Sequence, residues 1–417
     1  MAPQTRKGLQ RAGSGGHPSW TGCMKYVLRT YVWFRKIIKT TTMIKESKFD
    51  DIRPYYDEEI PAAMQRIASS TSFPLLASYV YPEESVEKVR QRIVGYTNIH
   101  DFQTETMRRV NEQVIARSIT EFTCDGISRL SPHDSYLYVS NHRDIMLDSS
   151  LLQYFLVTQG FDTTEITFGA NLMQGQLVID IGKSNKMFKV ERPGGGFKDF
   201  YRSSLHLSEY IRHAILEKHQ SVWIAQRNGR TKNGIDVTDQ GIIKMFCMSR
   251  MDDKIRALSE LHIVPVAVSY EWESCDILKT LELYQSQFSK YIKKPGEDLN
   301  SILTGLMQRK GRVHFELCEP IKEDELMQFD GLTNNEYHKA VAQLIDSRIN
   351  TAYRLWPNNY IAHDIRYGSK AFSAFYTKEE WEAFEHRLAQ LEKYEDCDLD
   401  QLKDIFLGIY SNPVDRK

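Results

Sequence analysis

The stretch Tyr138–Leu152, YVSNHRDIMLDSSLL, decides how the rest of the chain is interpreted. Its first residues are apolar enough for a buried strand, and its last residues begin an apolar helix. Burying a polar side chain costs free energy unless it is paired, so the polar residues between these elements need partners or a chemical role. These polar residues are Asn141, His142, Arg143, Asp144 and Asp148.

Three interpretations of this segment are open. In the first, Asn141 caps a turn, the charge of Asp148 suits the dipole of the helix that it opens, and His142 is simply hydrogen-bonded. In the second, the segment binds a metal, although one His and two acids supply few ligands. In the third, His142 is a general base. Asp148 or Asp144 would hold one ring nitrogen, and the other would take a proton from an attacking hydroxyl.

Beyond this segment, short β-rich runs alternate with helical patterns from about residue 135 to 320. The runs are YLYVS, ITFGA, FKVE, SVWIAQ, HIVPVAVSYEW and RVHFEL. Such alternation predicts an α/β fold: a mostly parallel sheet with helices on both faces, preceded and followed by helical segments. Ligands bind outside the carboxyl ends of the strands in such sheets, and His142 directly follows YLYVS.

The regions on either side of residues 135–320 are predicted to be helical. Residues 43–134 carry apolar residues at spacings of three and four, which predicts a helical N-terminal subdomain. Residues 321–417 return to helix and should pack on the body. This region includes a capping box, TKEE, in which the Thr377 side chain caps a helix and the Glu380 side chain bonds back to the Thr377 backbone.

Residues 1–42 form a basic leader, because residues 1–48 contain ten Lys or Arg residues and one Glu. The first part is rich in Gly, Ser and Pro, so we expect it to be disordered. Residues 24–40 have the pattern of an amphipathic helix lying on an anionic membrane surface. Alternatively, Met24 or Met43 is the true start of the protein.

The overall composition is that of an ordinary globular protein, with 41% hydrophobic and 26% charged residues. Six cysteines stand singly, which favours free thiols in a reducing compartment over structural zinc. No run approaches the roughly 18 to 20 apolar residues that span a bilayer, and no signal peptide is evident. We therefore expect a cytoplasmic protein. The absence of a GxSxG motif also argues against a serine hydrolase.

Two further strand ends carry cationic residues and glycines. FKVERPGGGF reaches Arg192 and continues into Pro193 and three glycines, and SVWIAQRNGRTKNG ends the next strand. Backbone amides and guanidinium groups near one another suit a phosphate or another anion, although a Gly/Arg loop alone is more often a solvated turn. The second loop contributes Arg227, Asn228, Gly229, Arg230 and Lys232.

The order of SNHRDIMLD, FKVERPGG, IAQRNGRTKNG and HIVPVAVSY resembles the four ordered blocks of the glycerol-phosphate and lysophosphatidate acyltransferase superfamily. The likeness covers roughly residues 135 to 272. The first block is most similar to a bacterial branch that reads NHRDI.LDS, which we associate with Bacteroidetes. The resemblance implies direct transfer of a fatty acyl group, without an acyl-enzyme, from acyl-CoA or acyl carrier protein to the hydroxyl of a lysolipid.

The resemblance also implies a role for each matching residue. His142 would be the general base and Asp148 would orient it. The implied substrate contacts are Asn141, Arg143, Arg192, Gly229 and Arg230, the last three for the acceptor's phosphate or head group. Asp144, Arg227, Asn228, Lys232 and Pro265 are secondary candidates. We expect no cofactor, no metal and no nucleic-acid partner, and a peripheral position on the inner face of the cytoplasmic membrane.

The chain departs from the superfamily pattern at two places. Five residues separate His142 from Asp148 where the superfamily usually has four, so either the turn is longer or Asp144 orients the histidine. We favour Asp148, because the apolar helix follows it. Asn228 stands where the third block usually has Glu, which makes the site more cationic. The alternative functions are acylation of an acylated amino acid, lipid binding without catalysis, and thioester hydrolysis.

Overall fold

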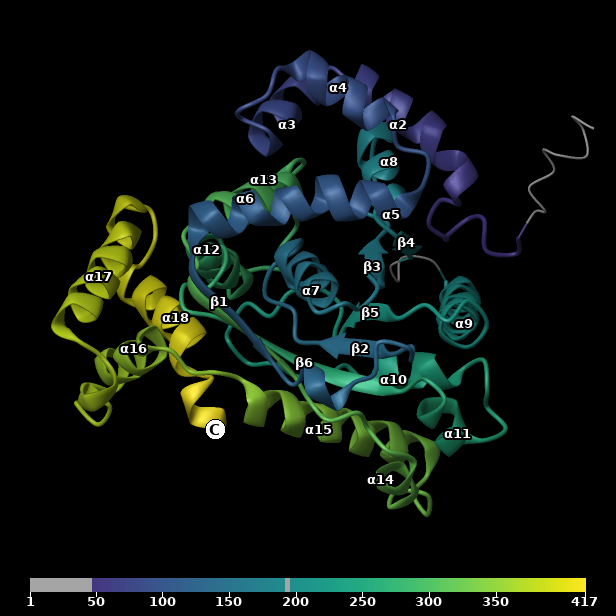
Figure 1. The fold of residues 1–417 in the computed structure, drawn as a ribbon. Coiled ribbons are helices and arrows are strands. Elements are labelled where there is room, and N and C mark those ends of the chain that lie inside the picture. Colours follow the sequence, from purple (N-terminus) through teal and green to yellow (C-terminus); the bar gives the residue numbers. More distant parts are fainter. Residues whose placement is uncertain (1–46, 192–195) are drawn as a thin grey trace, which may run out of the picture. The chain divides into compact units, whose positions relative to one another are not determined.

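The computed structural model describes residues 47–191 and 196–417 (Figure 1). The chain divides into two compact units, Met1–Asp51 and Ile52–Lys417, and the second contains every helix and strand described below. The expectations for the leader, residues 1–42, lie outside the described residues, as does the one for Arg192.

A seven-stranded sheet forms the centre of the second unit, in the order β1-β7-β6-β2-β5-β3-β4. Neighbouring strands are parallel except β6 and β7, which are antiparallel. The α/β prediction with a mostly parallel sheet is therefore confirmed. The strands are β1 Ile119–Asp125, β2 Leu137–Ser140, β3 Glu165–Gly169, β4 Met187–Val190, β5 Val222–Ala225, β6 Ile263–Tyr270 and β7 Gly311–Leu317.

Six of these strands coincide with the predicted runs, and β1 was not predicted. It lies in the part of the chain that was expected to be helical, residues 43–134. The strand is at the edge of the sheet and pairs only with β7, and most of its residues are exposed or half-buried. A strand with little buried surface has only a weak apolar pattern in its sequence. For this reason the helical prediction for residues 43–134 also covered β1.

Helices precede the sheet, as the sequence predicted. They are α2 Ile60–Ser69, α3 Phe73–Val80, α4 Val86–Val94, α5 Ile99–Asp101 and α6 Arg108–Ser118. The apolar faces of α2 to α5 form one buried cluster, which includes Ile60, Met64 and Phe73. Arg66 of α2 donates to the buried carboxylate of Asp180 at 2.7 and 2.9 Å, which ties this layer to helix α8 (Gln176–Ser184).

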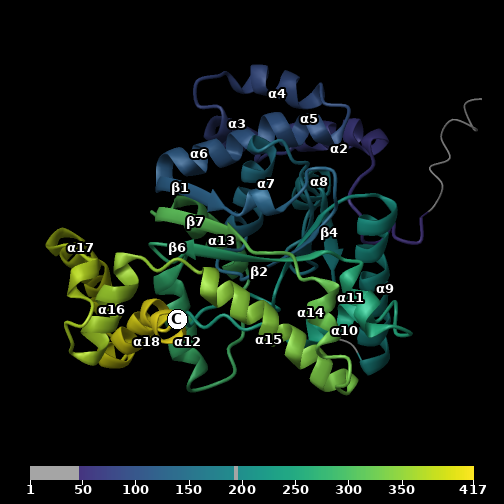
Figure 2. The same cartoon turned by 60° about the horizontal axis from the view of Figure 1, so that its bottom comes forward.

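Helices also cover both faces of the sheet (Figures 1 and 2). In both views α6 and α7 lie on one side and α15 lies on the other. Helix α7 directly follows β2 and is buried along most of its length. The helices between and after the strands are α7 Leu147–Thr158, α9 Phe197–Arg212, α10 Gln240–Cys247, α11 Lys254–Ser259, α12 Asp276–Ser286 and α13 Glu297–Met307.

The C-terminal region consists of α14 Glu323–Met327, α15 Asn334–Ala352, α16 Pro357–Tyr367, α17 Lys378–Ala389 and α18 Leu399–Ser411. The predicted capping box is present: the Thr377 amide donates to Glu380 at 2.9 Å, and the Glu380 amide donates to the Thr377 hydroxyl at 3.2 Å. Phe384 and Leu391 share a buried cluster with Trp272, which lies just after β6.

The described residues contain neither a disulfide nor a membrane-spanning helix. The cysteines among them are all free thiols. None of their helices combines the length and the apolar character needed to cross a bilayer.

Candidate functional site

The His142 turn lies between the carboxyl end of β2 and the start of α7. The imidazole Nδ1 of His142 is 2.9 Å from Oδ2 of Asp148, whose side chain is fully buried. The His142 side chain is 14% exposed, and no hydrogen bond joins its Nε2 to another residue that the structure describes. With Nδ1 donating to the carboxylate, the lone pair is on Nε2, the tautomer that a general base needs.

Asp148 is held from four directions. Its Oδ2 also accepts hydrogen bonds from the amides of Arg143 at 2.6 Å and Asp144 at 2.9 Å. Its Oδ1 accepts one from the Tyr270 hydroxyl at 2.7 Å. Burial and the neighbouring Asp148 raise the pKa of Tyr270 well above its ordinary value, so the phenol remains a donor. The orientation of the carboxylate toward His142 is therefore fixed.

Asp144 does not contact His142. Its Oδ1 accepts from the amides of Met146 and Leu147, both at 2.8 Å, at the start of α7. Its Oδ2 accepts from the Ser274 hydroxyl. Burial raises the pKa of Asp144, but the hydrogen bonds from Ser274, Leu147 and Met146 together with the charge of Lys310 outweigh it, and the pKa lies below the ordinary value. Of the two carboxylates that the sequence left open, Asp148 is the one on the histidine.

Asn141 and Arg143 are buried and bonded to other parts of the protein. The Asn141 amide donates to Asp236 and to the carbonyl of Val268, both at 2.9 Å. The Arg143 guanidinium is 1% exposed, donates to Asp236 at 2.6 Å and lies 3.3 Å from Glu273. These contacts fix the turn against the loop after β5 and the end of β6. Both side chains are buried and bonded within the protein rather than presented at its surface.

Arg230 lies in the loop that follows β5 and is 9% exposed. Its Nη1 is buried and has no hydrogen-bond partner among the described residues, and no ion pair there involves its guanidinium. The amide of the next residue, Thr231, donates to the carbonyl of His142 at 2.7 Å, so this loop lies against the histidine turn. A buried guanidinium without a carboxylate partner favours the binding of an anion.

The other predicted residues of this loop differ in their surroundings. Gly229 has a φ of +75°, a left-handed conformation that a side chain would disfavour. Asn228 is exposed and Arg227 is half-buried. Lys232 forms an ion pair with Glu282 of α12, which already satisfies its charge.

Two predicted residues lie apart from the histidine turn. Pro265 is a buried residue in the middle of β6, opposite Val139 of β2, and its carbonyl accepts from the Cys318 amide at 2.9 Å. It shapes the sheet beneath the turn. Arg192 falls in residues 192–195, which are outside the described part of the chain.

Several residues that complete the site were not among the sequence-based candidates. Tyr270, Glu273 and Ser274 lie at or just after the end of β6, the neighbour of β2, and Asp236 lies beyond β5. The indole of Trp223 stands edge-on to His142, with ring centroids 5.8 Å apart. The polar run YEWES follows a strand that pairs with β2. This run is the sequence signal that could have identified Tyr270, Glu273 and Ser274.

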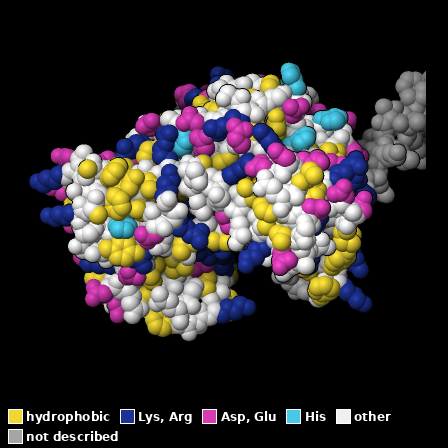
Figure 3. All heavy atoms as spheres, turned by 90° about the horizontal axis from the view of Figure 1, so that it is seen from below, with side chains coloured by type: hydrophobic (Ala, Val, Ile, Leu, Met, Phe, Trp, Pro, Cys, Tyr) yellow, Lys and Arg dark blue, Asp and Glu magenta, His cyan; other side chains and the backbone are white. Residues whose placement is uncertain are grey.

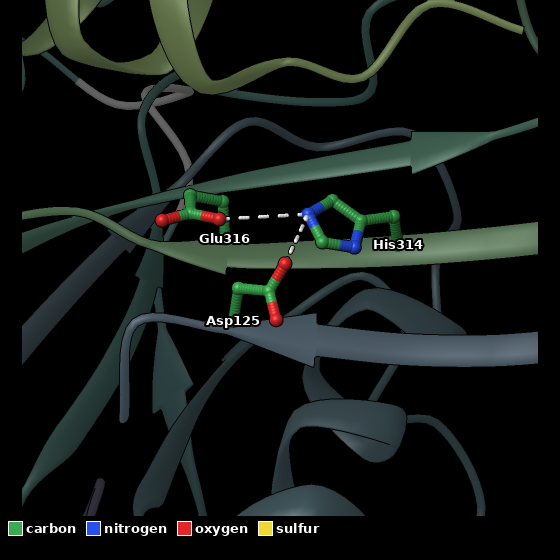
Figure 4. A group of neighbouring side chains, drawn as sticks. All are labelled: Asp125, His314 and Glu316. Atoms are coloured by element: carbon green, nitrogen blue, oxygen red, sulfur yellow. Dashed lines mark ion pairs between the residues drawn. The ribbon is translucent and has the colours of Figure 1, made fainter. Parts of the chain in front are cut away.

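A second group of side chains has the composition of a metal site (Figure 4). Asp125, His314 and Glu316 lie on β1 and β7, with ligand atoms within 4.8 Å of one another. Each carboxylate already has a cation beside it. Arg129 lies 2.5 Å from Glu316 and Arg354 lies 3.5 Å from Asp125. Two guanidinium groups at a two-carboxylate cluster disfavour a divalent ion there.

A cavity of about 1000 Å³ lies at the opposite ends of the strands. Tyr136 and His262, which directly precede β2 and β6, line it together with Asp253 and Lys322. Since His142 follows the carboxyl end of β2, this cavity is separate from the histidine turn.

Comparison with known proteins gives structural likenesses but no match in sequence. No family model matches the sequence, and no curated protein sequence matches it. Among solved structures, the chain is similar to the 1-acyl-sn-glycerophosphate acyltransferase PlsC from Thermotoga maritima, at 11% identity and a TM-score of 0.34. The likeness covers 71% of this chain and 96% of that chain. So low a TM-score does not support an inference of function.

Proposed function

We propose that this protein is an O-acyltransferase. It would move a fatty acyl group from an acyl-CoA or acyl carrier protein thioester to the hydroxyl of a lysolipid resembling 1-acylglycerol 3-phosphate, at the cytoplasmic side of a membrane. The supporting observation is the His142 imidazole, held at Nδ1 by Asp148 at 2.9 Å and unbonded at Nε2 within the described residues. This is the arrangement that proton abstraction from a hydroxyl requires.

The chemistry needs one base and no acyl-enzyme. Nε2 of His142 accepts the hydroxyl proton as the acceptor oxygen attacks the thioester carbonyl carbon. The resulting imidazolium is stabilised by Asp148, which its own four hydrogen bonds keep in place. When the tetrahedral intermediate collapses, the carbon–sulfur bond breaks, and the imidazolium returns the proton to the leaving thiolate. The products are the ester and the free thiol of the carrier.

Arg230 supports an anionic acceptor. Its buried Nη1 has no partner among the described residues, and its loop touches the His142 turn through the Thr231 amide. With Asn228 rather than Glu before Gly229, that position offers no carboxylate to neutralise the guanidinium. A phosphate on the acceptor would supply the missing negative charge, and the carboxylate of an acylated amino acid is the second candidate.

The test is acyl transfer from labelled acyl-CoA or acyl carrier protein to a panel of phosphate and carboxylate lipid acceptors. The intact protein should acylate one acceptor class, and His142→Ala should lower the rate by at least about a hundredfold, the scale of losing a general base. His100→Ala, which changes an exposed histidine of α5, serves as the matched control. Competition between the two acceptor classes identifies the preferred anion.

Two results would contradict the proposal. If no acceptor is acylated, or if His142→Ala transfers as fast as the intact protein, the histidine has a structural role. Release of free fatty acid without any acceptor would instead indicate a thioester hydrolase.

A further inference from the structure

Five large apolar side chains are exposed within a short span that ends with α13. Their exposed fractions range from 50% to 81%. An exposed apolar group of this size needs an explanation when its members are neighbours rather than scattered. On the face seen from below, hydrophobic side chains form separate patches among charges of both signs (Figure 3). The five are Phe288, Ile292, Leu299, Leu303 and Met307.

Helix α13 has two distinct faces. Leu299, Leu303 and Met307 recur every four residues and so form one exposed stripe. Ser301 and Gly305 are buried on the other face. A Cβ on Gly305 would lie 2.4 Å from Oδ2 of Asp144, so this inner face packs directly on the His142 turn. The exposed stripe is therefore on the outer side of a helix whose inner side supports the proposed catalytic site.

The residues between α12 and α13 continue the exposed surface. Phe288 packs against Tyr284 with ring centroids 5.1 Å apart but remains 68% exposed, and Ile292 is 81% exposed. The side chain of Glu297 accepts from the Lys294 amide at 3.0 Å, which holds this segment to the first turn of α13. The segment directly before α13 thus adds two exposed apolar side chains, Phe288 and Ile292, to the three of the helix.

The charge that accompanies this surface is positive. Lys290, Lys294 and Arg309 are exposed, and none of them forms an ion pair with another described residue. The nearby acid Asp298 is already paired with Lys293. Exposed apolar side chains bordered by lysines are characteristic of surfaces that lie on anionic lipid, because the cations meet the head groups while the apolar groups enter the acyl boundary.

We propose that residues 287–309, comprising the segment before α13 and α13 itself, are the surface by which this protein docks on an anionic lipid bilayer. The reason for a bilayer at this position rests on the proposed function, since a lysolipid acceptor is drawn from a membrane. The docked protein would hold the His142 turn about one helix diameter, roughly 10 Å, from the lipid.

The experiment measures binding of the full chain to vesicles without donor or acceptor. Vesicles of phosphatidylcholine are compared with vesicles in which about a third of the lipid is phosphatidylglycerol. The triple variant Leu299→Ser, Leu303→Ser, Met307→Ser should bind the anionic vesicles at least about tenfold more weakly than the intact protein. A second variant, Lys290→Glu with Lys294→Glu, should weaken binding to the anionic vesicles and reduce its dependence on salt.

The matched control is Met251→Ser with Met327→Ser. These side chains are 72% and 60% exposed, and α14, which contains Met327, is drawn far from α13 in Figure 1. The control should bind vesicles as the intact protein does. Unchanged melting temperatures would show that all variants are folded.

Three outcomes would overturn the proposal. The intact protein fails to bind anionic vesicles, or the triple variant binds as tightly as the intact protein, or the control loses as much affinity. Binding of an acyl carrier protein that the triple variant abolishes, with vesicle binding intact, would assign the surface to a protein partner. Because no turnover is measured, vesicle binding that is lost in the triple variant supports the surface even if no acyl transfer is found.

Discussion

Of the histidines that lie beside carboxylates in the described part of the chain, the buried His314 and the partly buried His142 differ in which ring nitrogen is left without a hydrogen bond. His142, at the end of β2, has one nitrogen on Asp148 and the other without a partner among the described residues. His314, on β7, is 3% exposed. Its Nδ1 is 2.8 Å from the Thr123 hydroxyl, and its Nε2 is 3.5 Å from Glu316. Burial, followed by the nearby Arg354, lowers the pKa of His314.

The comparison teaches that a histidine and an acid in contact do not by themselves make a catalytic site. At β7, both imidazole nitrogens have polar neighbours, and arginines offset the acids. At β2, both oxygens of Asp148 accept hydrogen bonds, whereas Nε2 of His142 has no partner among the described residues. This nitrogen can therefore take a proton. The same contrast separates Arg143, which is paired with two acids, from Arg230, which has no acidic partner among the described residues.

The largest effect should come from changing the two histidines in parallel. His142→Gln removes the unbonded nitrogen and should slow acyl transfer by at least about a hundredfold. His314→Gln should leave transfer within a few-fold of the intact protein, because this side chain is buried away from the His142 turn. Steady-state rates on the acceptor found in the panel provide the measurement. Equal losses of the transfer rate in both variants would contradict the distinction between His142 and His314.

The next effect concerns Arg230. Arg230→Ala should raise the KM for an anionic acceptor by roughly tenfold to a hundredfold, through loss of a charge-assisted contact. It should not lower the melting temperature, because it removes a buried charge that has no partner among the described residues. Lys232→Met, in the same loop, is the control for the KM measurement. An unchanged KM together with a lower melting temperature would make Arg230 structural.

A smaller effect should follow Tyr270→Phe, which removes one hydrogen bond from Asp148. The carboxylate would then attract the His142 proton more strongly, so the acid limb of the pH profile of kcat/KM should move to higher pH. The rate at the optimum should fall several-fold, the scale of one hydrogen bond at about 1 kcal/mol. A loss of rate with an unmoved acid limb would mean that Tyr270 only supports packing.

The smallest effect concerns the stability contributed by His314. Its folded pKa lies below the usual 6.5, so the unfolded chain binds the proton more readily. The contribution of His314 to the free energy of unfolding is therefore fully present above about pH 6.5. It is lost as the pH falls from there through the folded pKa, by at most about 1.4 kcal/mol per pH unit. Urea unfolding at pH 7.5 and 5.5 should show a smaller difference for His314→Gln than for the intact protein. An equal difference would assign the pH dependence to other groups, such as His338, whose pKa is also lowered.

The fold was largely predictable because most of the strands are short apolar runs that are largely buried and separated by helices of clear period. Val222–Ala225 and Ile263–Tyr270 are buried along nearly their whole length. Strand β1 was missed because only its first residue is buried. The reversal of β7 relative to β6 was also beyond sequence reasoning, because a strand's direction depends on where the chain returns rather than on its own residues.

The site was predictable in its position and its central pair, and less so in the roles of the surrounding residues. His142 and Asp148 follow the end of a strand, and their contact follows from that local geometry. Arg143 was expected to contact substrate because it belongs to the block that resembles the acyltransferase superfamily. Its actual partners, Asp236 and Glu273, are 93 and 130 residues away in the sequence. Contacts at such separations leave no local pattern.

Asn141 has a consequence for the order in which the chain acquires its structure. It joins the turn to Asp236 and to Val268, which are 95 and 127 residues further along. Closing loops of this length is slow, so such contacts form late in folding. During synthesis, the His142 turn would leave the ribosome well before β6 exists to hold it. The nascent chain therefore carries the proposed catalytic residues for a long interval before they can take their final positions.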